Sequence, residues 1–199
     1  MGGYGRTPLE QHFDRELVVI WAGPEAVDVL FSGTDVVDWA AVHEAGHVVA
    51  AWRFGRGIAG AIVRSEGSGV ALLGPIGDST ASASTQSLWL EEPATPTAPA
   101  SRREPARTDV RRAVAIARLL RQDKTAAWAL VRTRRFEARI FVNQHADLIR
   151  AVASELRQRG RISGLEAEQI IERTLADARV KRWRELGFLK APAAAGVMS

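Results

Sequence analysis

The chain has 199 residues, of which 46% are hydrophobic and 25% are charged, and its formal net charge is +4. These values are typical of a soluble globular protein with one domain, a substantial core and room for a small helical appendage. The absence of cysteine excludes disulfides, cysteine-ligated zinc fingers and thiol catalysis.

The basic residues are mostly arginine, with 24 Arg against 3 Lys, and acidic residues are interleaved with them. This pattern favours solvated helix faces over a nucleic-acid-binding patch. The opening sequence MGGYGRTPLEQHFDREL lacks the order of a secretion signal, and the longest apolar stretches are too short to span a bilayer. We therefore expect a cytoplasmic protein with no membrane segment in this chain. The high arginine and alanine content is typical of a GC-rich bacterial genome.

An N-terminal segment (residues 1–33) precedes the first strongly predicted helix. Gly23 and Pro24 interrupt the apolar run LVVIWAGPEAVDVLF, and Pro24 favours the first turn of a short helix. A longer helix is predicted from Thr34 to Phe54, because Thr34 can cap it and apolar residues recur with helical spacing. The helix is predicted to end there because Gly55 and Gly57 follow.

Two short strands and a long loop follow the helix. The strands are predicted at Ala59–Arg64 and Val70–Leu73, with EGSG between them as a hairpin turn. Residues 77–107 are rich in Ser, Thr, Ala and Pro, which predicts a long loop.

The rest of the chain is predicted to be helical almost to its end. One helix begins at Thr108, and a second runs from about Thr125 to Arg159 with one break near its middle. Ser163 and Glu166 have the spacing of a capping box, which predicts the start of a last helix. Residues 184–199 are predicted to form a C-terminal tail.

The motif HEAGH lies within the first long helix. Because residues four apart share a helix face, His43 and His47 can bind one zinc ion through their imidazoles. Glu44 can then act as general base on a water that the zinc activates, as metal-assisted hydrolysis requires. Gly46 costs about 1 kcal/mol against alanine in a helix, so it predicts the close approach of a second backbone.

A catalytic zinc usually takes three protein ligands, so a third is needed. His12 and His145 are the remaining histidines, and both lie in polar stretches that favour a surface position. A carboxylate is therefore the better candidate.

Four stretches of the sequence resemble the peptidase domain of the FtsH-type zinc metalloproteases. HEAGHVVAAW is similar to the family's active-site helix, and AIVRSEGSGVALLG to its following strand pair. TDVRRAVAIARLL is similar to a later alanine-rich helix, and FVNQHADLIRAVASELRQRGRISGLEAEQI to the closing helices. The stretches occur in the family's order between residues 40 and 171.

The resemblance implies a mainly α fold over residues 34–183, with an active-site helix, a small β-hairpin or sheet and a C-terminal helical bundle. It also implies that the aspartate opening the later helix, here Asp109, is the third zinc ligand. Asp35 is a rival, because AGPEAVDVLFSGTD resembles an element that the family carries elsewhere. Asp35 is disfavoured because it is predicted in the same helix as His43, two turns earlier.

The favoured function is a zinc metalloendopeptidase that hydrolyses peptides or unfolded proteins, with His43, His47 and Asp109 as metal ligands and Glu44 as general base. The sequence has no GxxxxGK[ST] phosphate loop, so unlike the family it would work without an ATPase or with a separate one. A homo-oligomer is possible, and no nucleic acid is expected. The alternatives are a non-catalytic metal-binding or interaction module of the same fold, and a nucleic-acid-associated helical protein.

Overall fold

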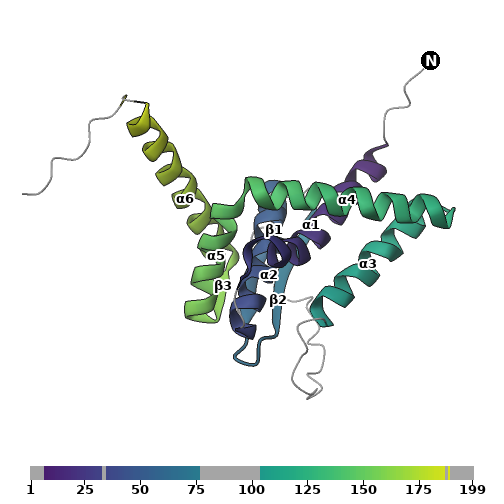
Figure 1. Cartoon of the computed structure of the whole chain (residues 1–199), viewed down its shortest axis with the longest axis horizontal. Helices are drawn as coiled ribbons and strands as arrows, with labels where there is room; N and C mark the ends of the chain where they lie inside the picture. Colours follow the sequence, from purple (N-terminus) through teal and green to yellow (C-terminus); the bar gives the residue numbers. More distant parts are fainter. Residues whose placement is uncertain (1–6, 33–34, 77–103, 187, 189–199) are drawn as a thin grey trace, which may run out of the picture.

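Six helices and three strands make up the described part of the chain, which is residues 7–32, 35–76, 104–186 and 188 of a computed structural model. The elements follow one another as shown in Figure 1: α1 (Pro8–Leu30), α2 (Val36–Arg53), β1 (Arg56–Val63), β2 (Gly69–Ile76), α3 (Glu104–Leu120), α4 (Lys124–Gln144), α5 (Ala146–Arg159), β3 (Arg161–Ser163) and α6 (Gly164–Glu185). The prediction of a mainly helical fold with a small sheet is confirmed.

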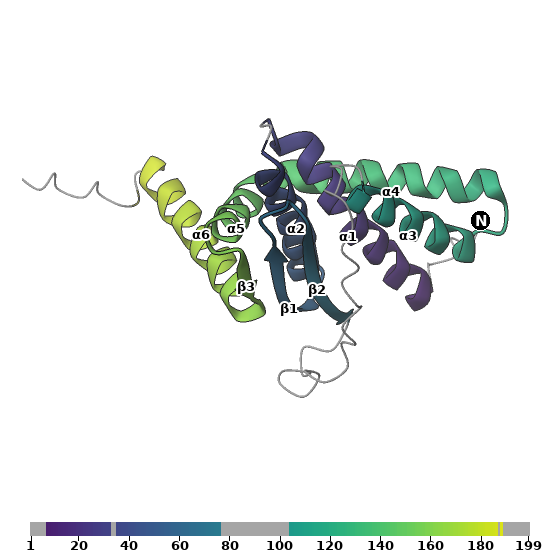
Figure 2. The ribbon, with the colours of Figure 1, turned by 90° about the horizontal axis from the view of Figure 1, so that it is seen from below.

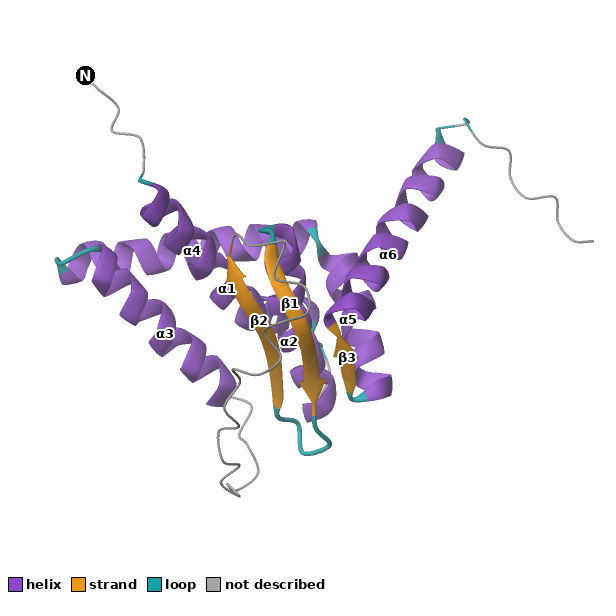
Figure 3. Ribbon diagram, turned by 180° about the vertical axis from the view of Figure 1, so that it is seen from behind, coloured by secondary structure: helices purple, strands orange, loops and turns teal. Residues whose placement is uncertain are grey.

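Helix α2 forms the centre of the core. It packs against α1, α5 and the two long strands, and Figures 2 and 3 show these strands lying against it from two directions. Its side chains from Ala40 to Ala51 are almost all buried, as expected for a helix that other elements surround. The helix is capped by Asp35, whose carboxylate accepts a hydrogen bond from the Val37 N–H at 2.7 Å. Thr34, the predicted cap, lies outside the described residues.

The sheet has three antiparallel strands in the order β2–β1–β3. The predicted hairpin is present, but both of its strands are longer than the sequence indicated. Strand β3 was not predicted, because its three residues are too few to show a period-2 pattern. It pairs with β1 through Gly60–Ser163, Ala61–Ile162 and Ile62–Arg161. Strand β2 therefore lies at an edge of the sheet.

Helix α1 runs without interruption through Gly23 and Pro24, so the predicted break there is wrong. Pro24 has no N–H and removes one intrahelical hydrogen bond. The helix continues because its middle is packed on both sides: Leu17 and Ala22 are fully buried, and α1 contacts both α2 and α4. Tertiary packing here outweighs the local signal of the proline.

The C-terminal helices largely follow the predicted order. Helix α3 begins at Glu104, so the last four residues of the predicted loop 77–107 are helical, with a proline suited to the first turn. Residues 77–103 lie outside the described part. The predicted break lies at His145, which ends α4 and precedes α5. The capping box of Ser163 and Glu166 is present at the start of α6.

Helix α6 ends at Glu185, two residues into the predicted tail 184–199, and residues 187 and 189–199 lie outside the described part. Among the helices that the structure describes, none combines the length and the apolar composition that crossing a bilayer requires.

Candidate metal centre

Helix α2 places His43 and His47 one turn apart on the same face, and both side chains are buried. The His43 ring stacks on the Trp39 indole, with centroids 5.0 Å apart and planes at 14°. The two imidazoles meet edge to face, and their Nε2 atoms are 3.2 Å apart. The HEAGH spacing therefore brings both rings to one point, as the sequence predicted.

Two glycines allow α1 to cross α2 at this point. A Cβ on Gly46 would lie 2.5 Å from the carbonyl oxygen of Ala22 in α1, so the predicted close approach of a second backbone is confirmed. A Cβ on Gly23 would overlap the His47 ring, with its Cε1 atom only 2.7 Å away. The role of Gly23 was missed, because a glycine beside a proline reads locally as a turn signal.

The crossing also fixes the orientation of one imidazole. His47 Nδ1 lies 2.9 Å from the Val19 carbonyl oxygen, and because a carbonyl only accepts, Nδ1–H is the donor. In the neutral ring the lone pair then lies on Nε2, which faces the site. Metal-ligating histidines are commonly held by a backbone carbonyl in this way. His43 Nδ1 is buried and has no such partner in the described part of the chain.

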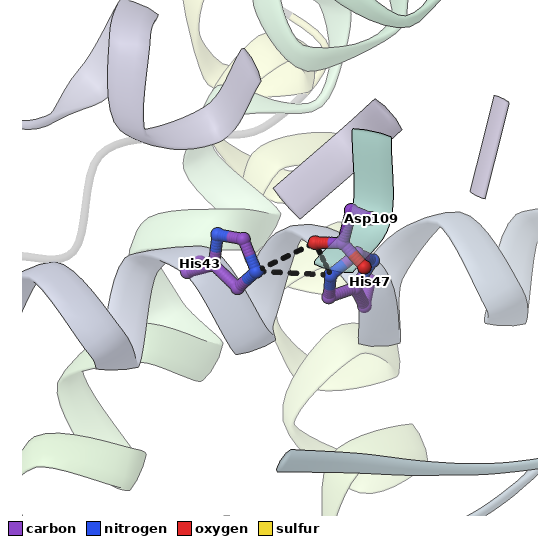
Figure 4. A group of neighbouring side chains, drawn as sticks. All are labelled: His43, His47 and Asp109. Atoms are coloured by element: carbon purple, nitrogen blue, oxygen red, sulfur yellow. Dashed lines mark hydrogen bonds and ion pairs between the residues drawn. The ribbon is translucent and has the colours of Figure 1, made fainter. Parts of the chain in front are cut away.

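The third group is Asp109, on the second turn of α3. Its Oδ2 atom lies 3.0 Å from His43 Nε2 and 3.3 Å from His47 Nε2, as Figure 4 shows. The local sequence contained no signal for this contact, because Asp109 is far along the chain from His43 and His47. Only the resemblance pointed to Asp109. The rival Asp35 is the cap of α2, while His12 is exposed and His145 lies between α4 and α5.

The three ligand atoms have the spacing that a zinc ion requires. In a tetrahedral site with bonds of about 2.0–2.1 Å, neighbouring ligand atoms lie about 3.3 Å apart. The observed separations among His43, His47 and Asp109 are 3.0, 3.2 and 3.3 Å. Asp109 Oδ2 is buried and accepts no hydrogen bond of ordinary geometry from the described residues. These residues therefore fit a zinc ion.

The imidazoles and the carboxylates of the site shift one another's pKa values. Burial opposes protonation of His47, but the neighbouring carboxylates outweigh it and raise the pKa of His47 to about 9. Burial alone would raise the pKa of Asp109, but the two imidazoles hold it well below its usual value. The buried Oδ2 atom of the ionised Asp109 therefore faces two rings and requires a positive charge beside it, either a proton or a metal ion.

Glu44 lines the same cavity as these three residues, and its side chain is buried. The Ala71 N–H in β2 donates a hydrogen bond to its carboxylate. A Cβ on Gly69 would lie 2.7 Å from Glu44 Cγ, so this glycine leaves the space that the glutamate occupies. Burial raises the pKa of Glu44 above its ordinary value, against the charges of His43 and His47.

A cavity of about 320 Å³ adjoins the group. His43, Glu44, His47 and Asp109 line it together with residues of α1, β1, β2 and α3. A ligand in this cavity would thus contact the side chains of His43, His47 and Asp109 together with that of Glu44.

An ion-pair network, missed at the level of sequence, holds α3 in place. Glu16 in α1 is buried, and its two carboxylate oxygens contact different arginines. Arg56 Nη1, in β1, is 2.6 Å from Oε2, and Arg112 Nη2, in α3, is 2.7 Å from Oε1. Arg112 is one helical turn after Asp109, so Glu16 ties the aspartate's helix to α1.

Comparisons of this chain with protein-family models, with curated proteins and with solved structures found no match. The chemistry of the site therefore rests on the residues described above.

Proposed function

We propose that this chain is a zinc-dependent metallopeptidase of the FtsH type that hydrolyses peptide bonds in peptides or unfolded proteins. The observation that carries the proposal is the convergence of His43, His47 and Asp109 at 3.0–3.3 Å, with the buried carboxylate of Glu44 beside them. The resemblance of the sequence to FtsH-type peptidases supports the same activity.

Bound zinc would supply a Lewis acid that polarises a peptide carbonyl and lowers the pKa of a water molecule. Glu44 would accept the proton that this water loses, at a carboxylate oxygen, and deliver it to the amine that leaves. A raised pKa suits this role, because the carboxylate must hold the proton between the two transfers. Val19 would keep the Nε2 lone pair of His47 directed at the metal.

The substrate would bind along β2. This edge strand borders the cavity through Val70, Ala71 and Leu73. An extended peptide can add to such an edge through backbone hydrogen bonds, which give affinity with little sequence preference. This mode suits peptides and unfolded proteins. We propose that the enzyme acts in the cytoplasm, alone or with a separate ATPase that unfolds its substrates.

The experiment measures bound zinc and cleavage of casein for the parent protein, Glu44→Gln and Asp109→Ala. Glu44→Gln should keep zinc and lose at least about a hundredfold in cleavage rate, since it removes only the proton acceptor. Asp109→Ala should lose most of both.

Zinc binding without cleavage by the parent protein would contradict the enzyme and favour a non-catalytic metal-binding module. Salt-sensitive DNA retention without zinc would favour the nucleic-acid alternative.

A further inference from the structure

Helix α4 carries a cationic face that nothing covers in the described part of the chain. The face consists of Trp128, Arg132, Phe136, Arg139 and Ile140. Its three large apolar side chains are 42%, 64% and 43% exposed. Within the described residues, neither arginine has an ion-pair partner.

Helix α6 carries an acidic face of matching character. The face consists of Leu165, Glu168, Glu172 and Leu175, which recur at intervals of three, four and three residues and so share one side of the helix. Leu165 is 66% exposed and Leu175 is 36% exposed. The two glutamates are exposed and make no ion pair with the described residues.

The two faces do not cover each other within one chain. Both are exposed, and Figures 1 and 3 show α6 projecting away from the body while α4 extends towards the opposite side. Each face places charges between apolar side chains, and the two sets of charges have opposite sign. Apolar contacts with matched charges between them are the ordinary composition of a specific interface between helices.

We infer that the cationic face of α4 binds the acidic face of α6 on a second copy of the chain. Burial of the Trp128, Phe136 and Ile140 side chains against Leu165 and Leu175 would supply the apolar contact. The glutamates would neutralise Arg132 and Arg139, which a purely apolar partner would leave buried without a counter-charge.

A phosphate-rich partner fits these faces less well. Nucleic acid would neutralise the arginines but leave the three large apolar side chains of α4 without contacts, and it would repel Glu168 and Glu172 on α6. A second copy satisfies both faces at once. The inference does not depend on the proposed metallopeptidase activity.

The test uses the full chain and analytical ultracentrifugation over a range of protein concentrations. The parent protein should self-associate. Arg132→Glu with Arg139→Glu should weaken this association on the order of a hundredfold, because like charges then face each other. Glu168→Arg with Glu172→Arg should do the same. Lys181→Glu with Arg184→Glu, a matched charge reversal on exposed residues on the other side of α6, should have little effect.

Mixing the two weakened variants supplies the decisive measurement. The α4 variant has two acidic faces and the α6 variant has two cationic faces, so each alone should associate only weakly, and the mixture should associate as the parent does. Circular dichroism confirms that each variant is folded.

Three results would overturn the inference: a parent protein that is monomeric at every concentration, association that the charge reversals leave unchanged, and a mixture that stays monomeric. Binding of anionic vesicles or DNA by a parent protein that does not self-associate would assign the cationic face to a different partner.

Discussion

The histidines and the aspartate of the candidate site reach it by different routes. His43 and His47 belong to α2, the most buried helix of the core, and α1 crosses directly over them. Asp109 arrives on α3, which the structure attaches to α1 through the ion pair of Glu16 and Arg112. Close packing of two helices thus positions the histidines, whereas Asp109 depends in addition on an ion pair between the buried Glu16 and the largely exposed Arg112.

This difference predicts how each part fails. A packing defect at the crossing of α1 and α2 should displace a ligand outright, because a closely packed core has no space for an added atom. Loss of an ion pair at α3 should weaken the site by degrees, because the helix keeps its apolar contacts with α1 and α4.

The largest expected effect comes from Gly23→Ala. The added Cβ would overlap the His47 ring, so the ring must leave its position or the helices must separate. We expect a loss of zinc affinity of about a hundredfold and of unfolding free energy of about 1–3 kcal/mol. Isothermal titration with zinc and chemical denaturation measure the two losses.

Gly57→Ala is the matched control, because the nearest atom to its added Cβ would be the Gly74 Cα at 3.9 Å. It should leave zinc affinity unchanged. A Gly23→Ala protein with parental affinity would show that the crossing does not position His47.

A smaller effect is expected from Glu16→Gln, which removes the charge that holds Arg112. Zinc affinity should fall about tenfold, as for other groups that position a ligand without touching the metal. Arg121→Gln is the control. Arg121 directly follows the last residue of α3, whereas Asp109 lies near the helix's first residue, and the variant removes only an exposed ion pair with Glu10.

A double-mutant cycle distinguishes positioning from general destabilisation. If Glu16 acts through Arg112, the effects of Glu16→Gln and Arg112→Gln on zinc affinity should be less than additive. Fully additive effects, or an equal loss in Arg121→Gln, would contradict the role assigned to Glu16.

A separate effect, on stability and not on zinc affinity, concerns the metal-free protein. The folded pKa of His47, about 9, lies above the ordinary value of 6.5. The stabilising proton is therefore fully bound in the folded protein below pH 6.5 and is lost as the pH rises through about 9. Asp109 stays ionised over this window, since its pKa is lowered. Unfolding free energy should fall by about 3 kcal/mol across the window.

Urea denaturation of the chelator-treated protein at several pH values measures this change. Asp109→Asn should flatten the profile, because it removes the charge that holds the proton on His47. A profile that slopes equally in both proteins would show that the slope arises elsewhere.

Local patterns predicted the parts of the fold that depend on a few neighbouring residues. The helix that carries HEAGH, the hairpin, the break near His145 and the capping box of Ser163 are all present. Gly46 was informative because a glycine in a buried helix has few explanations other than close packing.

The remaining features depend on tertiary contacts that no short window contains. Pro24 predicted a helix start, and the packing of α1 on both sides keeps the helix continuous. Strand β3 exists only because β1 offers it an edge. Glu16 and Arg112 are 96 residues apart, so their ion pair left no local signal. Asp109 was reached only through the resemblance.

X-ray absorption spectroscopy of the zinc-loaded Glu44→Gln variant tests the central claim most directly. We predict a zinc shell with two imidazole nitrogens and a carboxylate oxygen at about 2.0–2.2 Å, and loss of one imidazole in a second variant that also carries His47→Ala. A zinc shell without imidazole scattering, or one that is unchanged when Asp109 is replaced by alanine, would contradict the site formed by His43, His47 and Asp109.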